Sequence, residues 1–188
     1  GRAIVDMIRE RNAALERRYN CQLVMRAWCN TSRMILSGNE DEIYGWAADE
    51  DAEHMEVNFD TMAEHIREKH GPYAVIVDCS NSAAVAQFHS SWLASGIHIV
   101  TANKHGMGGP LDLFREILAQ KVVANYLYET TVGAGLPMLG TIKQLQDAGD
   151  PIRMIRGTLS ASINWVMQRV NPSALSGGAV EGCSLLEA

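Results

Sequence analysis

The sequence predicts an α/β protein with a mainly parallel sheet, and two observations support this class. Segments with helical periodicity alternate with short apolar segments along most of the chain. Two of the apolar segments, residues 73–79 and 97–101, are rich in β-branched side chains and almost free of charge, which is typical of strands covered on both faces of a parallel sheet. The crossovers between such strands are expected to be right-handed.

The individual elements follow from local patterns. Residues 2–16 repeat apolar side chains at helical spacing. Pro110 suits a first helical turn, and Gly96 and Gly149 suit helix ends. The predicted helices cover residues 2–16, 61–69, 82–95, 111–120, 136–148 and 162–170. The predicted strands cover residues 22–28, 73–79, 97–101, 122–128 and 152–159.

Composition excludes several classes of protein. The chain has 188 residues, of which 47% are hydrophobic, so it can bury the core of one domain or of one domain and part of another. Its formal charge of -6 argues against a nucleic-acid partner, and no apolar run approaches the roughly 20 residues that span a bilayer. No Cys-x-x-Cys or His-x-x-x-His pair occurs, so a transition-metal site is not indicated.

Residues 34–66 contain ten acidic residues and no Lys or Arg. The pattern favours a solvated insertion or crossover segment. Tyr44 and Trp46 within it could also pack on the core.

Candidate site residues follow the predicted strands, because ligands of open α/β sheets bind beyond the carboxyl ends of the strands. The segments in question are polar or glycine-rich, although each alone is also explained by the residue preferences of turns. They are residues 30–33, 78–82, 101–104, 129–137 and 157–162.

The end of the second strand of a dinucleotide-binding fold selects the cofactor. An acid there binds the ribose hydroxyls of NAD, whereas an Arg accommodates the 2′-phosphate of NADP. Asn30, Ser32 and Arg33 stand there and no acid follows before Glu40, so NADP is favoured over NAD, unless Arg33 is only a surface charge.

Residues 78–82 can place hydroxyls and amides, those of Ser80 and Asn81 among them, against a nicotinamide ribose, although Ser80 or Ser82 can equally cap the next helix. Lys104 directly follows a buried strand. There its ammonium could bind a substrate carboxylate or do proton work, the alternative being a solvated turn lysine. Residues 129–137 combine a carboxylate with carbonyl groups suited to a hard cation, or form a glycine-rich turn beside a ligand.

Four segments resemble homoserine dehydrogenase, firmly over residues 75–167. VDCSNSAAVA is similar to the family's Val-Asp-Cys-Thr segment, and GIHIVTANKHGMGGP to its His-Val-Val-Thr-Pro-Asn-Lys segment. YETTVGAGLPMLGTIKQL resembles the Tyr-Glu-Ala-Thr-Val-Gly-Ala-Gly-Leu-Pro signature, and GDPIRMIRGTLSASINWVM resembles the segment containing Gly-Ile-Leu-Ser-Gly-Thr-Leu-Ser. The departures are Ala102 for Pro, His105 for Lys and Ala161 for Gly.

The resemblance implies a Rossmann-like NAD(P)-binding domain over residues 1–130 without its first strand, and the start of a catalytic and dimerisation domain over residues 131–188. The family interconverts L-aspartate 4-semialdehyde and L-homoserine with NADPH or NADH, in threonine, methionine and isoleucine synthesis. The resemblance also implies a homodimer and a possible fusion to an aspartate kinase, with no nucleic-acid or membrane partner. The expected location is the cytoplasm, or a plastid in a plant or alga.

The resemblance also assigns residues. Gly1 would be the last fingerprint glycine, under the pyrophosphate, and Ser80 and Thr101 would touch the cofactor. Lys104 would lie between nicotinamide and substrate and supply positive charge to catalysis. Glu129 and the carbonyls of Val132, Ala134 and Leu136 would hold a sodium ion. Ala161 and Ser162 would lie near the amino end of the substrate.

The family's catalytic Glu, Asp and proton-donating Lys are expected beyond residue 188, so this chain alone is expected to be a poor catalyst. Two alternatives remain open. One is a non-catalytic nucleotide-binding or regulatory module of the same fold, and the other is a dehydrogenase for a different semialdehyde or amino acid.

Overall fold

The computed structural model describes residues 1–48, 54–68, 71–170 and 184. The chain divides into two compact units, Gly1–Tyr128 and Glu129–Ala188. Among the described residues, no helix combines the length and apolar character that crossing a bilayer requires.

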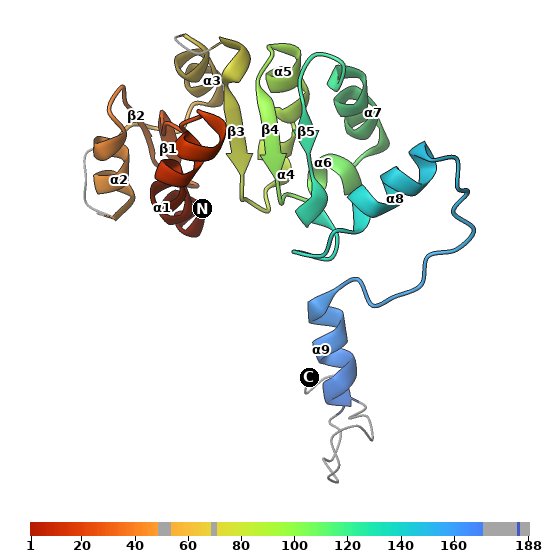
Figure 1. The fold of residues 1–188 in the computed structure, drawn as a ribbon. Coiled ribbons are helices and arrows are strands. Elements are labelled where there is room, and N and C mark those ends of the chain that lie inside the picture. Colours follow the sequence, from red (N-terminus) through yellow and green to blue (C-terminus); the bar gives the residue numbers. More distant parts are fainter. Residues whose placement is uncertain (49–53, 69–70, 171–183, 185–188) are drawn as a thin grey trace. The chain divides into compact units, whose positions relative to one another are not determined.

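The first unit is built on a parallel sheet of three strands, β3 (Val75–Asp78), β4 (His98–Thr101) and β5 (Tyr126–Leu127), in the order β3-β4-β5 (Figure 1). Asp78 pairs with Thr101 in the register, and Val100 pairs with Leu127. The strands therefore finish at the same edge. The predicted α/β class and parallel sheet are confirmed.

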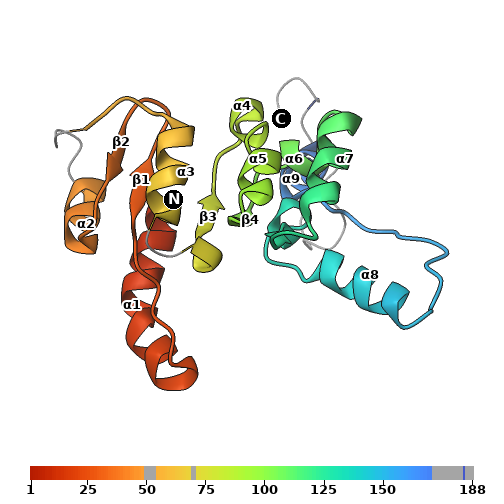
Figure 2. The same ribbon diagram turned by 90° about the horizontal axis from the view of Figure 1, so that it is seen from above.

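The two faces of this sheet differ. Helices α5 (His89–Ala94) and α7 (Leu111–Gln120) lie on one face, where Ile76, Ile99 and Tyr126 are buried (Figure 2). The side chains on the opposite face alternate with these and remain partly exposed: Val75, Val77, Val100 and Leu127. Parallel sheets are normally covered on both faces, whereas in the described part of this unit one face of the sheet remains partly exposed.

The predicted helix 82–95 is two helices, α4 (Ala83–Ala86) and α5, separated by Gln87 and Phe88. The N–H of Phe88 donates to the carbonyl of Val85 at 3.0 Å, a tighter turn than an α-helix makes. The break lies immediately before His89, the first residue of α5. Further along, α6 (His105–Gly108) leads into α7, which has the predicted bounds.

The start of the chain forms α1 (Arg2–Tyr19), followed by the antiparallel pair β1 (Ala27–Cys29) and β2 (Met34–Leu36). The sequence predicted a single strand over residues 22–28 and no partner for it. A tight turn joins the two strands, with the N–H of Asn30 donating to the carbonyl of Arg33 at 2.9 Å. The chain therefore reverses after β1 and does not enter a helix there.

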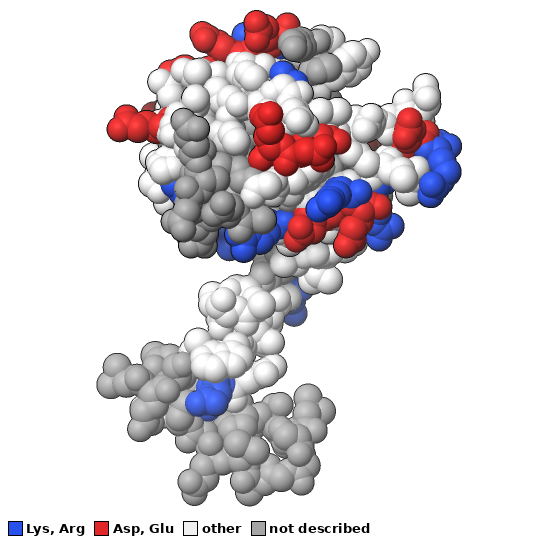
Figure 3. All heavy atoms as spheres, turned by 90° about the vertical axis from the view of Figure 1, so that its left-hand side faces the viewer, with Lys and Arg blue, Asp and Glu red and all other residues white. Residues whose placement is uncertain are grey.

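The acidic segment is part of the packed unit. It contains β2, α2 (Glu40–Ala48) and α3 (Phe59–Arg67), and its apolar residues Met34, Ile43, Met62 and Ile66 are buried. The segment was predicted to be a solvated insertion or crossover segment. Its described part connects β2 to β3 and is not solvated throughout, because its apolar side chains pack inward. Its acidic side chains lie mostly outward, and Figure 3 shows groups of Asp and Glu on this side of the molecule. Tyr44 is partly buried, and the side chain of Trp46 lies outside the described part.

The second unit contains the short 3-10 helix η2 (Glu129–Thr131), α8 (Met138–Asp147) and α9 (Ala161–Val170). The predicted strand 152–159 is wrong, because residues 150–160 are irregular. A strand needs a neighbour with which to exchange backbone hydrogen bonds, and this segment instead borders a shallow groove beside α8, lined by Ile142, Leu145, Ile152 and Met154 among others.

Candidate active site

The ends of β3 and β4 are joined by the backbone and by one hydroxyl group. The N–H of Ala102 donates to the carbonyl of Asp78 at 3.0 Å, and Oγ1 of Thr101 donates to the same carbonyl at 3.3 Å. Asp78 and Thr101 are both buried. These bonds fix the positions at which the chain leaves the two strands.

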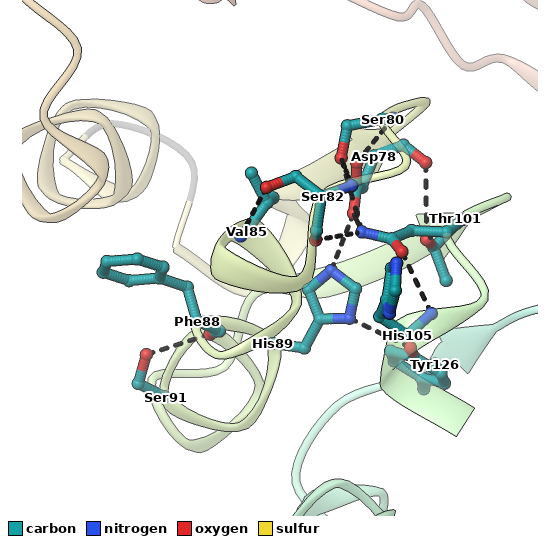
Figure 4. A network of polar contacts seen from close by, with 11 residues as sticks. Asp78, Ser80, Ser82, Val85, Phe88, His89, Ser91, Thr101, His105 and Tyr126 are labelled. Carbon is teal, nitrogen blue, oxygen red and sulfur yellow. Dashed lines mark hydrogen bonds and ion pairs between the residues drawn. The ribbon is translucent and has the colours of Figure 1, made fainter. Parts of the chain in front are cut away.

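The carboxylate of Asp78 is the centre of a polar network (Figure 4). Its Oδ1 accepts the N–H of Ser80 at 2.8 Å, and its Oδ2 accepts Nε2 of His89 at 3.0 Å and Nδ2 of Asn103 at 2.9 Å. Burial alone would raise the pKa of Asp78, but the hydrogen bonds from His89, Ser80 and Asn103 outweigh it and hold that pKa below its usual value. Asp78 is therefore a buried, ionised acceptor at neutral pH.

His89 and Tyr126 extend the network into the buried interior of the unit. The ring of His89 is fully buried, and its Nδ1 lies 3.0 Å from the hydroxyl of Tyr126. Burial, and then the charge of Asp78, raise the pKa of Tyr126 well above its usual value, so the phenol keeps its proton. Because a carboxylate can only accept, Nε2 of His89 carries a hydrogen, while Nδ1 is hydrogen-bonded to the hydroxyl of Tyr126.

Asn103 connects two loops through one buried side chain. Its Nδ2 donates to the carboxylate of Asp78, to the carbonyl of Ser82 at 2.8 Å and to Oγ of Ser80 at 3.3 Å. Its Oδ1 accepts the N–H of His105 at 3.0 Å. The side-chain amide of Asn103 thus holds the loop after β3 to the loop after β4.

Lys104 lies between Asn103 and His105, and its side chain is exposed. The network therefore fixes the backbone on both sides of Lys104 and leaves its ammonium open to a ligand. Ser80 is partly buried, Asn81 is exposed, and Oγ of Ser82 accepts the N–H of Val85 at 3.3 Å as the cap of α4. Of the two candidate caps in the sequence, Ser82 has this role.

Gly1 lies close to the ring of Trp28 in β1. A Cβ at this position would lie 2.7 Å from Cη2 of Trp28. The carbonyl of Gly1 accepts the N–H of Ile4 at 2.9 Å, so Gly1 also begins α1. Close packing of a helix on a strand is the role of the third glycine in a dinucleotide fingerprint.

The turn after β1 is organised by Asn30. Its Oδ1 accepts the N–H of Ser32 at 3.0 Å and the N–H of Arg33 at 2.9 Å. Burial, and then the charge of Asp78, raise the pKa of the Cys29 thiol at the end of β1. Arg33 thus stands in a turn whose backbone is held by the side chain of Asn30.

In the second unit, Glu129 caps α8. Its Oε1 accepts the N–H of Leu139 and its Oε2 the N–H of Gly140, both at 2.8 Å. Gly133 and Ala134 have positive φ angles of 71° and 53°. An ionised carboxylate offers about four lone-pair sites, so Glu129 can hold α8 and still contribute to a cation beside this twisted backbone.

The remaining predicted residues are exposed or belong to the same turn. Val132 is partly buried, and the carbonyl of Leu136 accepts the N–H of Met138 at 2.9 Å. Ala161 and Ser162 are exposed in the first turn of α9, which Ser160 begins by accepting the N–H of Ile163 at 3.2 Å. Ala161 and Ser162 thus lie at a helix start, the type of position at which backbone N–H groups remain available.

The predicted site segments included Asp78 and Asn103 but gave neither residue a role, and they did not include His89 or Tyr126. One signal was present, since Asp78 is the single charged residue in an otherwise apolar strand and a buried acid needs partners. The partners themselves come from α5, β5 and the loop after β4, and no spacing in the sequence connects them.

Several solved structures share this fold. A Candida auris protein of unknown function matches with a TM-score of 0.72 at 22% identity, over 90% of this chain and 48% of that one. A homoserine dehydrogenase from Thermoplasma acidophilum matches with a TM-score of 0.54 at 17% identity, over 76% of this chain and 44% of that one.

Curated relatives are more similar in sequence. A chloroplastic bifunctional aspartokinase/homoserine dehydrogenase of Zea mays is 32% identical over 88% of this chain and 18% of its own length. A homoserine dehydrogenase of Emericella nidulans is 34% identical over 56% of this chain and 29% of its own length. The chain thus spans about a fifth to a third of the length of these relatives.

The family model described as the NAD-binding domain of homoserine dehydrogenase matches residues 1–128. This match covers the parallel sheet, the polar network, Lys104 and the close contact of Gly1 with Trp28. The chain belongs to the homoserine dehydrogenase family, and residues 1–128 are its NAD-binding domain.

Proposed function

We propose that the protein carrying this chain is a homoserine dehydrogenase that interconverts L-aspartate 4-semialdehyde and L-homoserine with a nicotinamide cofactor. The observation that carries the proposal is the joining of the loops after β3 and β4 by Asp78 and Asn103. Ser80 and Lys104 belong to these two joined loops, which follow strand ends of the kind at which open α/β sheets bind ligands. A non-catalytic nucleotide-binding module has no comparable observation in its favour.

The cofactor residues form two groups. Ser80, Asn81 and Thr101 would contact the nicotinamide half, while Gly1 would lie under the pyrophosphate and Asn30, Ser32 and Arg33 would face the adenosine ribose. Arg33, in a turn braced by Asn30, supports a preference for NADP, because a guanidinium can bind a phosphate through two parallel hydrogen bonds. NAD remains the alternative cofactor.

Lys104 would act on the reacting carbonyl group. When bound, the reduced cofactor supplies the hydride. An ammonium fixed near the carbonyl oxygen stabilises the negative charge that develops there. The exposed side chain on a constrained backbone suits this role, since the charge is presented without a rearrangement of the loop.

In the second unit, we place a sodium ion at Glu129 and the carbonyls of Val132, Ala134 and Leu136, and the amino end of the substrate at Ala161 and Ser162. The positive φ angles of Gly133 and Ala134 support the sodium site, because they redirect carbonyl groups out of regular pairing. The ion would stabilise the turn and take no part in the chemistry.

The wider setting is part of the proposal. Residues 1–130 would be the cofactor domain and residues 131–188 the start of a catalytic and dimerisation domain. Bifunctional relatives support a fusion to an aspartate kinase, and the chloroplastic names of the plant relatives support a plastid location for a plant or algal source. For any other source the proposed location is the cytoplasm. A homodimer is also proposed.

The test is an assay of the full-length protein. Purified protein is mixed with NADP⁺ and either homoserine, serine or threonine, and reduction of the cofactor is followed by absorbance. Turnover with homoserine alone is expected. Binding of NADPH without turnover of any of these hydroxy-amino acids would contradict the proposal and favour the non-catalytic module.

A further inference from the structure

We propose that His89 is a positioning residue, which acts through Asp78 and Asn103 to hold the two loops that present Ser80 and Lys104. Which ligands bind at these loops rests on the proposed function. The hydrogen bonds by which His89 and Asp78 hold the loops do not depend on that function, because they lie within the chain itself.

His89 and Tyr126 together fix the orientation of the Asp78 carboxylate. His89 reaches Oδ2 of Asp78 from α5, on the buried side of the sheet, and Tyr126 holds the other ring nitrogen from β5 (Figure 4). The imidazole can therefore rotate only by breaking a buried hydrogen bond. This locks the direction in which the carboxylate faces the loops.

The oriented carboxylate of Asp78 in turn binds groups in both loops. Oδ1 of Asp78 holds the N–H of Ser80, and Oδ2 holds the amide of Asn103. Asn103 in turn holds the N–H of His105, one residue beyond Lys104. A change in the carboxylate would therefore move both loops together.

Hydrogen bonding and packing by His89 can be separated experimentally. Its ring centroid lies 5.8 Å from that of Trp92 and 5.6 Å from that of Tyr126. Phe at this position keeps an aromatic ring but loses both hydrogen bonds. Gln loses the ring but offers one amide donor to Asp78 and one carbonyl acceptor to Tyr126.

The experiment compares His89→Phe, His89→Gln and the wild type in the full-length protein, with Ser91→Ala as a control on the exposed side of α5. Amide hydrogen exchange at Ser80 and His105 is measured without ligands, and kcat and KM are measured with homoserine and NADP⁺. For His89→Phe we expect about tenfold faster exchange at both amides and a loss of about 10- to 100-fold in kcat. His89→Gln should recover both readouts in part, although its thermal stability should not exceed that of His89→Phe.

Unchanged exchange at Ser80 and His105 in folded His89→Phe would overturn the inference. So would activities that simply follow thermal stability across the two variants, since this would mean a role in packing alone. If His89→Phe does not fold, Tyr126→Phe decides, because it removes one hydroxyl and should speed the same two exchanges by about fivefold. A wild type that is inactive on homoserine would defeat the proposed function and leave the exchange result to decide the role of His89.

Discussion

Nε2 of His89 lies 3.0 Å from Oδ2 of Asp78, and both side chains are buried. The two residues are eleven positions apart, one in a helix and the other at the end of a strand. A buried carboxylate is tolerated only when donors surround it. The ionised state of Asp78, and with it the shape of the loops after β3 and β4, therefore depends on a residue outside those loops.

Replacement of Asp78 by Asn should lower the free energy of unfolding by roughly 3 kcal/mol at pH 7, because one oxygen that accepts from the network becomes a donor. The loss should shrink in acid. The pKa of Asp78 is lowered in the folded protein, so its carboxylate stabilises the fold fully above the unfolded value of about 3.9 and loses this effect as the pH falls through the lower folded value. Urea unfolding at pH 7 and in steps below pH 4 measures both effects.

Asp112→Asn is the matched control, since the Asp112 side chain is 91% exposed on α7. It should change the free energy of unfolding by no more than about 0.5 kcal/mol. A difference between wild type and Asp78→Asn that stays constant down to the acid transition would contradict the assignment of Asp78 as the ionised centre.

Gly106→Ala should disturb the network from the side of Tyr126. A Cβ at Gly106 would lie 2.3 Å from the hydroxyl of Tyr126 and 3.0 Å from Nδ1 of His89. Both atoms are buried, so the expected loss in the free energy of unfolding is about 1–3 kcal/mol. Gly108→Ala is the control within the same helix, because no atom lies within 4 Å of its Cβ position. Equal thermal stabilities of the two variants would count against the close approach.

The parallel strands could be predicted because their side chains carry the information locally. Residues 73–79 and 97–101 are apolar and β-branched whatever their partners are, and polar residues mark where each strand ends. The position of Lys104 beyond β4 followed from this pattern alone.

Other features depend on partners and could not be predicted. The strand β2 exists because it pairs with β1, and residues 152–159 are not a strand because none of the described residues pairs with them. The break at Gln87 and Phe88 separates α4 from the helix that carries His89, and the helical spacing of residues 82–95 conceals it. Pairing and side-chain contacts are tertiary properties, which spacing along the chain does not encode.

Lys104→Ala in the full-length protein should reduce kcat with homoserine by about 10²- to 10³-fold, because it removes the charge proposed to stabilise the developing alkoxide. The side chain is exposed, so thermal unfolding should be unchanged. Lys121→Ala removes another exposed ammonium of the same unit and should retain activity. Unchanged turnover in Lys104→Ala would remove this residue from the site.

Arg33→Ala should weaken binding of NADPH by about 10-fold or more, with little change for NADH, because only NADPH carries the 2′-phosphate. Titration of the full-length protein with each cofactor, followed by nucleotide fluorescence, gives the two dissociation constants. Arg115→Ala, an exposed arginine on α7, is the control. Equal losses for both cofactors would mean that Arg33 does not read the phosphate.

Glu129→Ala should loosen the start of α8. The N–H groups of Leu139 and Gly140 would lose their acceptor, and a negative charge would leave the amino end of the helix, which costs about 1–2 kcal/mol. Amide exchange should therefore accelerate at Leu139 and Gly140, and the thermal midpoint should fall. Asp150→Ala removes an exposed acid beyond the other end of α8 and should leave these two amides protected. If sodium also binds at Glu129, added NaCl should raise the midpoint of the wild type more than that of Glu129→Ala, whereas equal shifts would assign the carboxylate to capping alone.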